Sequence, residues 1–189
     1  MFTNLLLHIE KFARLTEEEK AIVQQYAKHQ KLKKKELLLK EGQVCAANCF
    51  ISQGCMRMYY INEKGIEQTT HFAIENWWIA DYLSLDRQTP STFYIQAVEA
   101  CEVVLLDKRT EEELLGKVPA LEHYFRTVFQ KALAASQLRI KYLYDFTGEE
   151  RYHHFNNRFP EFLQRVPQYM VASYLGFTPE FLSKIRAKK

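Results

Sequence analysis

The chain has 189 residues, of which 47% are hydrophobic and 14% aromatic. This composition excludes a disordered chain, because it supplies enough apolar surface to bury a core in one sizeable domain and a smaller one. No apolar run approaches the ~18 residues of a membrane span, and residues 1–10 lack the pattern of a signal peptide. We therefore expect a cytoplasmic protein without membrane contact.

Positive charge is concentrated near the C-terminus. Residues 151–189 hold seven Lys or Arg and two Glu, a net charge of +5, whereas the whole chain carries +3, so residues 1–150 carry −2. A basic end on a slightly acidic body is typical of a module that binds nucleic acid, because neutralised phosphates supply much of the affinity.

The N-terminal part is expected to be helical. Residues 1–12 are weakly periodic, and Thr16 with Glu19 forms a capping box that starts a helix ending at about Lys28. The basic run Lys31–Lys35 is interpreted as a solvated strand edge, since exposed lysines protect an edge against pairing.

From Leu37 to Leu106 the pattern favours short strands. Gly42, Gly54 and Gly65 mark turns between apolar or alternating segments rich in β-branched and aromatic residues, which predicts an antiparallel barrel or sandwich. The predicted strands are Leu37–Lys40, Asn48–Ser52, Cys55–Ile61, Glu67–Ala73, Thr92–Ala97 and Cys101–Asp107.

Four cysteines lie in or near these strands: Cys45, Cys49, Cys55 and Cys101. No pair has the C-x-x-C spacing, so we expect reduced, buried thiols. The spacing of the first three fits no metal motif, and His71 offers no partner ligands, so we predict no metal and no bound cofactor.

A long helix is predicted from Pro119 to about Phe146, with two apolar stripes. One stripe can lie on the strands and the other on a second copy of the chain. The expected dimer contacts are Leu121, Phe125, Val128, Ala132 and Ala135, and the second stripe comprises Phe129, Leu133, Ile140 and Leu143.

After a second capping box at Thr147–Glu150, two short helices are joined by a tight turn. Pro167 begins the first, Gly176 ends it, and Thr178 caps the second. Two helices joined by a short turn with a Gly are typical of a helix-turn-helix, whose second helix enters the major groove.

Residues 172–186 resemble the helix-turn-helix of the Crp/Fnr transcription regulators, and the three turn glycines resemble those of the cyclic-nucleotide-binding β-roll in that family. The resemblance implies an α+β fold: a sensor domain (1–118) of N-terminal helices and antiparallel β-roll, a dimerisation helix (119–146) and a DNA-binding domain (147–189). It also implies a homodimer on double-stranded DNA. The implied DNA contacts are Tyr169, Thr178, Glu180, Phe181, Ser183, Lys184, Arg186, Lys188 and Lys189.

The family also implies a phosphate-binding cassette, with a Gly-Glu pair followed by Arg-Ser or Arg-Thr. The matching positions here are Ala80, Asp81, Tyr82, Ser91 and Thr92. Ser91 replaces the arginine, and a buried phosphate without its cation is poorly compensated, so we expect weak or no binding of cyclic AMP. The aromatic residues around the cassette either line a pocket for another effector or fill the core: Trp77, Trp78, Tyr82, Phe93 and Tyr94.

Two functions remain open at this point. The first is a dimeric DNA-binding regulator with a small-molecule effector of unidentified chemistry. The second is a small-molecule-binding β-roll whose helical tail contacts other proteins. An enzyme is not expected, because no catalytic Ser-His-Asp or Cys-His arrangement is placed by any motif.

Overall fold

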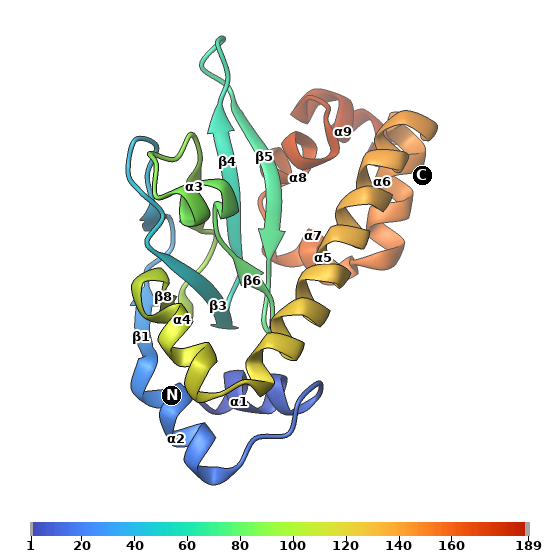
Figure 1. Ribbon diagram of the computed structural model, residues 1–189. Helices are drawn as coiled ribbons and strands as arrows, with labels where there is room; N and C mark the ends of the chain where they lie inside the picture. Colours follow the sequence, from blue (N-terminus) through green and yellow to red (C-terminus); the bar gives the residue numbers. More distant parts are fainter. Residues whose placement is uncertain (1, 188–189) are drawn as a thin grey trace.

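A computed structural model describes residues 2–187, which form an α+β fold (Figure 1). Two four-stranded antiparallel sheets face each other, in the strand orders β1-β8-β3-β6 and β2-β7-β4-β5. Helices cover one end of this roll, and a long helix leads from it to the C-terminal helices. The predicted fold class is confirmed.

The strands are β1 Ala27–Leu32, β2 Leu37–Leu39, β3 Ala47–Gln53, β4 Met56–Ile61, β5 Glu67–Ala73, β6 Trp78–Ile79, β7 Tyr94–Ala97 and β8 Cys101–Asp107. The helices are α1 Thr3–Glu10, α2 Glu17–Tyr26, α3 Tyr82–Arg87, α4 Lys108–Lys117, α5 Ala120–Asp145, α6 Gly148–Arg158, α7 Pro160–Arg165, α8 Gln168–Leu175 and α9 Pro179–Ala187.

Local signals set many of these boundaries. Both predicted capping boxes form, at Thr16 with Glu19 and at Thr147 with Glu150. Gly54 has a φ of +102°, and a Cβ there would lie 2.6 Å from the Cys101 sulfur. Both the backbone conformation and the close contact therefore require glycine at this turn. The glycine at this turn between β3 and β4 is therefore a feature that the sequence alone could identify.

Other boundaries differ from the sequence prediction. The second helix ends at Tyr26 instead of Lys28, because residues from Ala27 onward pair with β8. Helices α3 and α4 were not predicted; Asp81 and Asp107 cap them by accepting hydrogen bonds from backbone amides. Strand pairing set the end of α2, and single capping residues set the starts of the short helices α3 and α4. Neither feature produces a periodic pattern in the sequence.

Three groups of buried residues form the core. One fills the space between the sheets, and a second packs α1, α2, α4 and the start of α5 on the first sheet. The third joins Cys55, Phe72 and Val98 of the roll to buried residues of α6, α7, α8 and α9. The C-terminal helices thus share a core with the roll.

The start of α5 corrects two predicted dimer contacts. Leu121 and Phe125 are buried in the chain's own core beneath α1 and β6, and Val128 packs partly against the same group. A side chain already enclosed by its own chain has no surface left for a partner. Ala132 and Ala135, farther along the helix, are exposed.

All four cysteines are buried and free. Burial raises the pKa of the Cys55 thiol to about 12 and that of Cys101 to about 11. Neither thiol forms a reactive thiolate near neutral pH, which agrees with the prediction of buried packing residues.

Candidate nucleic-acid interface and ligand cassette

Helices α8 and α9 form the predicted helix-turn-helix geometry. Gly176 ends α8 with a φ of +81°, a left-handed conformation that favours glycine. Thr178 then caps α9, because its hydroxyl oxygen accepts a 3.3 Å hydrogen bond from the Phe181 amide. The two caps fix the turn between the helices.

Helix α9 has one buried and one exposed face. Leu182 and Ile185 are buried against the other C-terminal helices. The opposite face leaves polar and charged side chains in solvent: Glu180, Ser183, Lys184 and Arg186. An amphipathic helix with an exposed charged face is available for a groove, as the sequence predicted.

Two exposed side chains at the start of α9 are engaged locally. The pKa of the Glu180 carboxyl is lowered by hydrogen bonds from the Glu180 backbone amide and from the Thr178 hydroxyl. The Ser183 hydroxyl donates a 3.0 Å hydrogen bond to the Pro179 carbonyl oxygen. Glu180 is therefore an anion at neutral pH, whereas Ser183 must give up its bond to the helix before donating elsewhere.

Phe181 has a packing contact as well as an exposed edge. Its side chain is 42% exposed, and its ring lies 5.3 Å from that of Phe177. A Cβ added to Gly148 would come within 2.5 Å of the Phe181 ring, so the first turn of α6 seats this ring closely. The structure thus gives Phe181 a role in placing α9 against α6.

The remaining predicted DNA contacts lie apart from α9 or outside the structure's description. Tyr169 is exposed near the start of α8. Lys188 and Lys189 lie outside the described residues. Arg186 is the last cation of α9 that the structure places, and its side chain is exposed.

The predicted cassette positions lie between β6 and β7, around helix α3. Asp81 caps α3, since its Oδ1 accepts hydrogen bonds of 3.1 Å from the Leu83 amide and 3.2 Å from the Ser84 amide. Its Oδ2 accepts a 2.7 Å hydrogen bond from the Ser91 hydroxyl. Ala80, Asp81 and Ser91 are all buried, and two of the five predicted positions, Asp81 and Ser91, are joined in one hydrogen-bond network.

The other two cassette positions lie at the surface, where Tyr82 is partly exposed but its ring and hydroxyl make contacts within the chain. Thr92 is exposed. The Tyr82 ring packs edge-on against Phe129 of α5, with 5.3 Å between ring centroids, and its hydroxyl donates a 3.3 Å hydrogen bond to the Asn48 side chain. Burial raises the pKa of the Tyr82 hydroxyl. Helix α3 and helix α5 are therefore in direct contact.

The aromatic residues around the cassette divide between core and surface. Trp78 is buried against Phe50 and Phe125, and Trp77 is partly exposed. Phe93 packs edge-on against Tyr60, and Tyr94 stacks on Tyr59. Trp78, Tyr82, Phe93 and Tyr94 therefore each pack against an aromatic ring outside this group.

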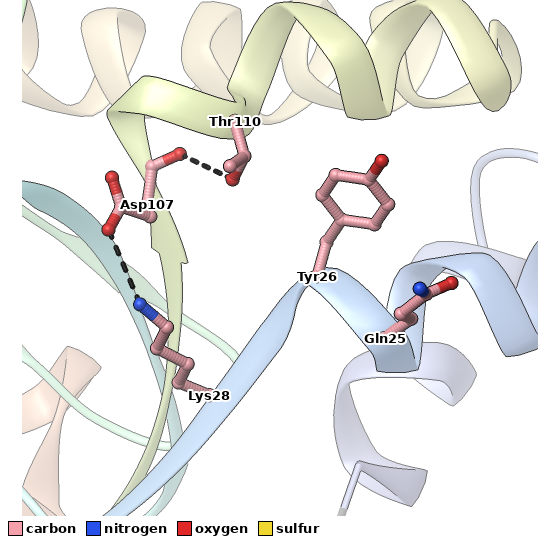
Figure 2. A pocket seen from close by; sticks show the side chains of 5 residues that line it. All are labelled: Gln25, Tyr26, Lys28, Asp107 and Thr110. Atoms are coloured by element: carbon pink, nitrogen blue, oxygen red, sulfur yellow. Dashed lines mark hydrogen bonds and ion pairs between the residues drawn. The ribbon is translucent and has the colours of Figure 1, made fainter.

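A small cavity lies away from the cassette, where α2 meets β1 and β8 meets α4 (Figure 2). It measures about 220 Å³, and Lys28 and Asp107 on its wall form an ion pair of 3.4 Å. Asp107 also accepts a hydrogen bond from the Arg109 amide, which lowers the pKa of this carboxyl. The charges of this wall are satisfied internally, so the cavity offers little to a ligand.

The outer half of α5 carries an exposed apolar stripe. Leu133 is 61% exposed, Ile140 54% and Tyr144 86%. Spacings of seven and four residues place these three side chains on one face of the helix. Leu133 and Ile140 belong to the second stripe found in the sequence, whose first member, Phe129, packs partly against the chain's own core.

Sequence reasoning missed the contacts that join the C-terminal helices to the roll. Ser173 of α8 and Arg165 of α7 both bond to residues of the roll. No local signal identifies them, because their partners lie from 66 to 106 residues away in the chain. The Ser173 hydroxyl, on the otherwise apolar side of α8, was the one sequence feature that indicated such a contact.

Residues 2–187 contain no group of three or more His, Cys, Asp or Glu side chains placed to hold a metal ion. Among the same residues, no helix is both long and apolar enough to cross a membrane.

Residues 29–117 match the cyclic nucleotide-binding domain family. The chain is similar to the anaerobic regulatory protein of Haemophilus influenzae, with 26% identity over 165 residues that cover 82% of this chain and 63% of that protein. It is also 26% identical to the fumarate and nitrate reduction regulatory protein of Yersinia pestis over 165 residues, or 82% of this chain and 65% of that protein. The chain thus spans a little under two thirds of the length of these relatives.

Solved structures share the fold. FixK2 from Bradyrhizobium japonicum superposes with a TM-score of 0.69 at 17% identity, covering 86% of this chain and 83% of that one. The c-di-GMP responsive global regulator CLP from Xanthomonas campestris has a TM-score of 0.72 at 10% identity, covering 92% and 91%. More than four fifths of this chain superposes in each case.

Proposed function

Because this chain belongs to the Crp/Fnr family of transcription regulators, which are not enzymes, we propose that it binds double-stranded DNA as a homodimer and reads it with α9. Two copies of a helix-turn-helix on one dimer match two half-sites about one helical turn apart. The proposed partners are DNA and a second copy of the chain.

The exposed face of α9 is the observation that carries this proposal. Glu180 and Lys184 lie four residues apart on one side of the helix, and Arg186 follows at its end. A glutamate can accept from a cytosine amino group, a lysine can donate to guanine, and an arginine can pair with phosphate. This face supports base contacts at the start of α9 and phosphate contacts at its end.

The dimer is proposed to form along the outer half of α5. Leu133, Ile140 and Tyr144 give a stripe that the chain itself leaves uncovered. Parallel helices from two copies bury such a stripe against each other, in the manner of a coiled coil. Ala132 flanks this seam, about 100° around the helix from Leu133, whereas Ala135 lies about 160° from Leu133 on the opposite face. Leu121 and Phe125 lie outside the seam.

The roll is proposed to act as a sensor that does not use cyclic AMP. The carboxylate of Asp81 is already satisfied by Ser91 and by α3, and the cassette has no cation for a cyclic phosphate. An effector of another chemistry remains part of the proposal. We retain 1–118, 119–146 and 147–189 as sensor, dimerisation helix and DNA-binding unit.

A salt titration tests DNA binding directly. Duplexes selected by the protein from a random-sequence pool should bind with an affinity that falls steeply as salt rises, since bound phosphates release counterions. A control is the same titration with Lys184→Ala and Arg186→Ala together, which should flatten the slope. Failure to select any duplex would favour the alternative, a ligand-binding roll whose helical tail contacts proteins.

A further inference from the structure

We infer that the helix-turn-helix docks on the outer edge of β5 through α8. Ser173 and Arg165 are then positioning residues that hold α9 in a fixed place relative to α5. The effect on DNA binding rests on the proposed function, whereas the docking itself rests on contacts between the roll and the C-terminal helices. In Figure 1, α8 lies beside β5, on the side away from β4.

Ser173 takes the place of a neighbouring strand. Strand β5 is the last strand of its sheet, so alternate peptide groups on its outer side lack a strand partner. The Thr69 amide donates a 2.8 Å hydrogen bond to the Ser173 hydroxyl oxygen. The same hydroxyl donates a 2.9 Å hydrogen bond to the Glu67 carbonyl oxygen. One side chain of α8 thus satisfies both edge groups at once, which uses its donor and an acceptor lone pair.

Arg165 makes a second attachment, beyond the other end of β5. Its guanidinium donates to both carboxylate oxygens of Glu75, at 3.0 and 2.8 Å, and also to Glu99. Glu75 in turn accepts a 2.8 Å hydrogen bond from the Gly54 amide. Bidentate pairs of this kind fix orientation as well as distance. Arg165 therefore ties α7 to two separate loops of the roll.

Apolar contacts fill the space between these two attachments. The Phe72 ring of β5 lies 5.7 Å from Phe162 and 5.1 Å from Tyr174, measured between centroids. Both partners belong to the C-terminal helices, and all three belong to or pack against one core group. The polar contacts at the two ends fix where the C-terminal helices sit on this apolar surface of the roll.

Helix α5 holds α8 from the other side. Arg139 donates a 3.0 Å hydrogen bond to the Tyr174 carbonyl oxygen, and its guanidinium carbon lies 4.3 Å from the centre of the Tyr174 ring. Cations are favoured at the C-terminal end of a helix, where free carbonyl groups gather. Helix α8 is thus held between the edge of β5 and the helix proposed to form the dimer.

This arrangement has a consequence for DNA binding. In a dimer, two α9 helices reach both half-sites only if each is held at a set place relative to α5. Rigid attachment preorganises the pair, whereas loose attachment lowers the effective concentration of the second helix at its half-site. Binding to a single half-site needs no such placement.

Amide hydrogen exchange tests the attachment without DNA. In Ser173→Ala the Thr69 amide loses its acceptor, so its exchange should accelerate about tenfold or more, while amides within β3 and β8 keep their protection. Ser173→Thr retains the hydroxyl and should restore slow exchange at Thr69. Unchanged exchange at Thr69 in Ser173→Ala would overturn the attachment.

DNA binding tests the positioning role. The probes are a duplex selected by the wild-type protein and the same duplex with one half-site scrambled. Ser173→Ala and Arg165→Gln should each weaken the intact duplex about tenfold and leave the scrambled one within about twofold. Arg158→Gln removes an exposed arginine of α6 and is the matched control for Arg165→Gln.

The two tests separate the possible failures. Equal losses on both duplexes would mean that these residues act on α9 itself or on folding, and the positioning role would be wrong. Accelerated exchange at Thr69 with unchanged affinity for the intact duplex would also contradict it. If the wild-type protein selects no duplex, the proposed function fails, and the exchange result alone then decides whether the attachment exists.

Discussion

The hydroxyl of Ser91 donates a 2.7 Å hydrogen bond to the carboxylate of Asp81, and both side chains are buried between β6 and β7. Asp81 also caps α3 with its other oxygen. The two residues thus complete each other's hydrogen bonds at the place where the family resemblance puts a bound phosphate. A phosphate entering here would meet the Asp81 carboxylate, and none of the five cassette positions carries a cation.

Cyclic AMP should therefore bind with a dissociation constant weaker than ~1 mM. Like charges at close range repel, and opening the network would leave the buried Asp81 carboxylate without its donor. Isothermal calorimetry measures this directly. Saturable binding in the micromolar range would show that the cassette rearranges around the ligand, and a structure of that complex should then show Ser91 separated from Asp81.

The proposed dimer seam predicts different outcomes for two leucines of α5. Leu133→Glu should cost the dimer at least ~2 kcal/mol, because a charge would be enclosed in an apolar contact. Leu138→Glu makes the same chemical change on a residue that is also exposed, but about 140° around the helix from Leu133.

Sedimentation or light scattering over a dilution series distinguishes these outcomes. We expect monomer for Leu133→Glu and dimer for Leu138→Glu. The reverse result would place the seam on the Leu138 face of the helix, and dimers in both variants would remove α5 from the interface.

The two ends of α9 should contribute differently to DNA binding. Glu180→Ala should cost ~1–3 kcal/mol on the selected duplex and relax the preference at one base pair, because the glutamate lies in the first turn of the helix. Arg186→Ala should weaken all duplexes about equally and reduce the salt dependence by about one phosphate contact.

Binding assays on the selected duplex and on single-base variants measure both effects. Equal, sequence-independent losses for both variants would indicate that Glu180 does not face the bases. The base contacts would then have to come from residues such as Phe181 and Lys184, and Phe181 is already engaged with Phe177 and Gly148.

Two histidines should make the protein less stable in mild acid. Burial, with Lys11 and Lys131 nearby, lowers the pKa of His8 to about 4, and burial near Arg139 lowers the pKa of His71 to about 4. Between the unfolded pKa of 6.5 and about 4, the unfolded chain binds more protons than the folded chain. Stability contributed by the neutral rings is complete above pH 6.5 and falls as the pH drops toward 4.

His8 offers the cleaner variant for this test. The Trp78 indole donates to the Tyr124 hydroxyl, and Nδ1 of His8 lies 2.8 Å from the same hydroxyl, whose proton it accepts in the Nε2–H tautomer. His8→Gln keeps an acceptor but does not titrate, and the fall in melting temperature from about pH 7.5 to about pH 5 should become shallower. The exposed His153→Gln is the matched control, and equal slopes in all three proteins would contradict the prediction.

The sequence by itself determined the features that depend on neighbouring residues. The capping boxes at Thr16 and Thr147, the left-handed glycine at Gly176 and the cap at Thr178 all form as predicted, because each involves residues within a few positions. The same locality made the helix-turn-helix and the turn glycines of the roll recognisable, and with them the fold class.

Only the tertiary structure decided what depends on distant residues. It buried Leu121 and Phe125 of one stripe of α5 in the chain's own core and left Leu133 and Ile140 of the other exposed, a choice that two similar apolar patterns cannot make. It also joined Asp81 to Ser91 and Ser173 to the edge of β5. Hydrogen bonds across such separations depend on how the sheets and helices pack, and packing is a property of the whole chain that no local pattern encodes.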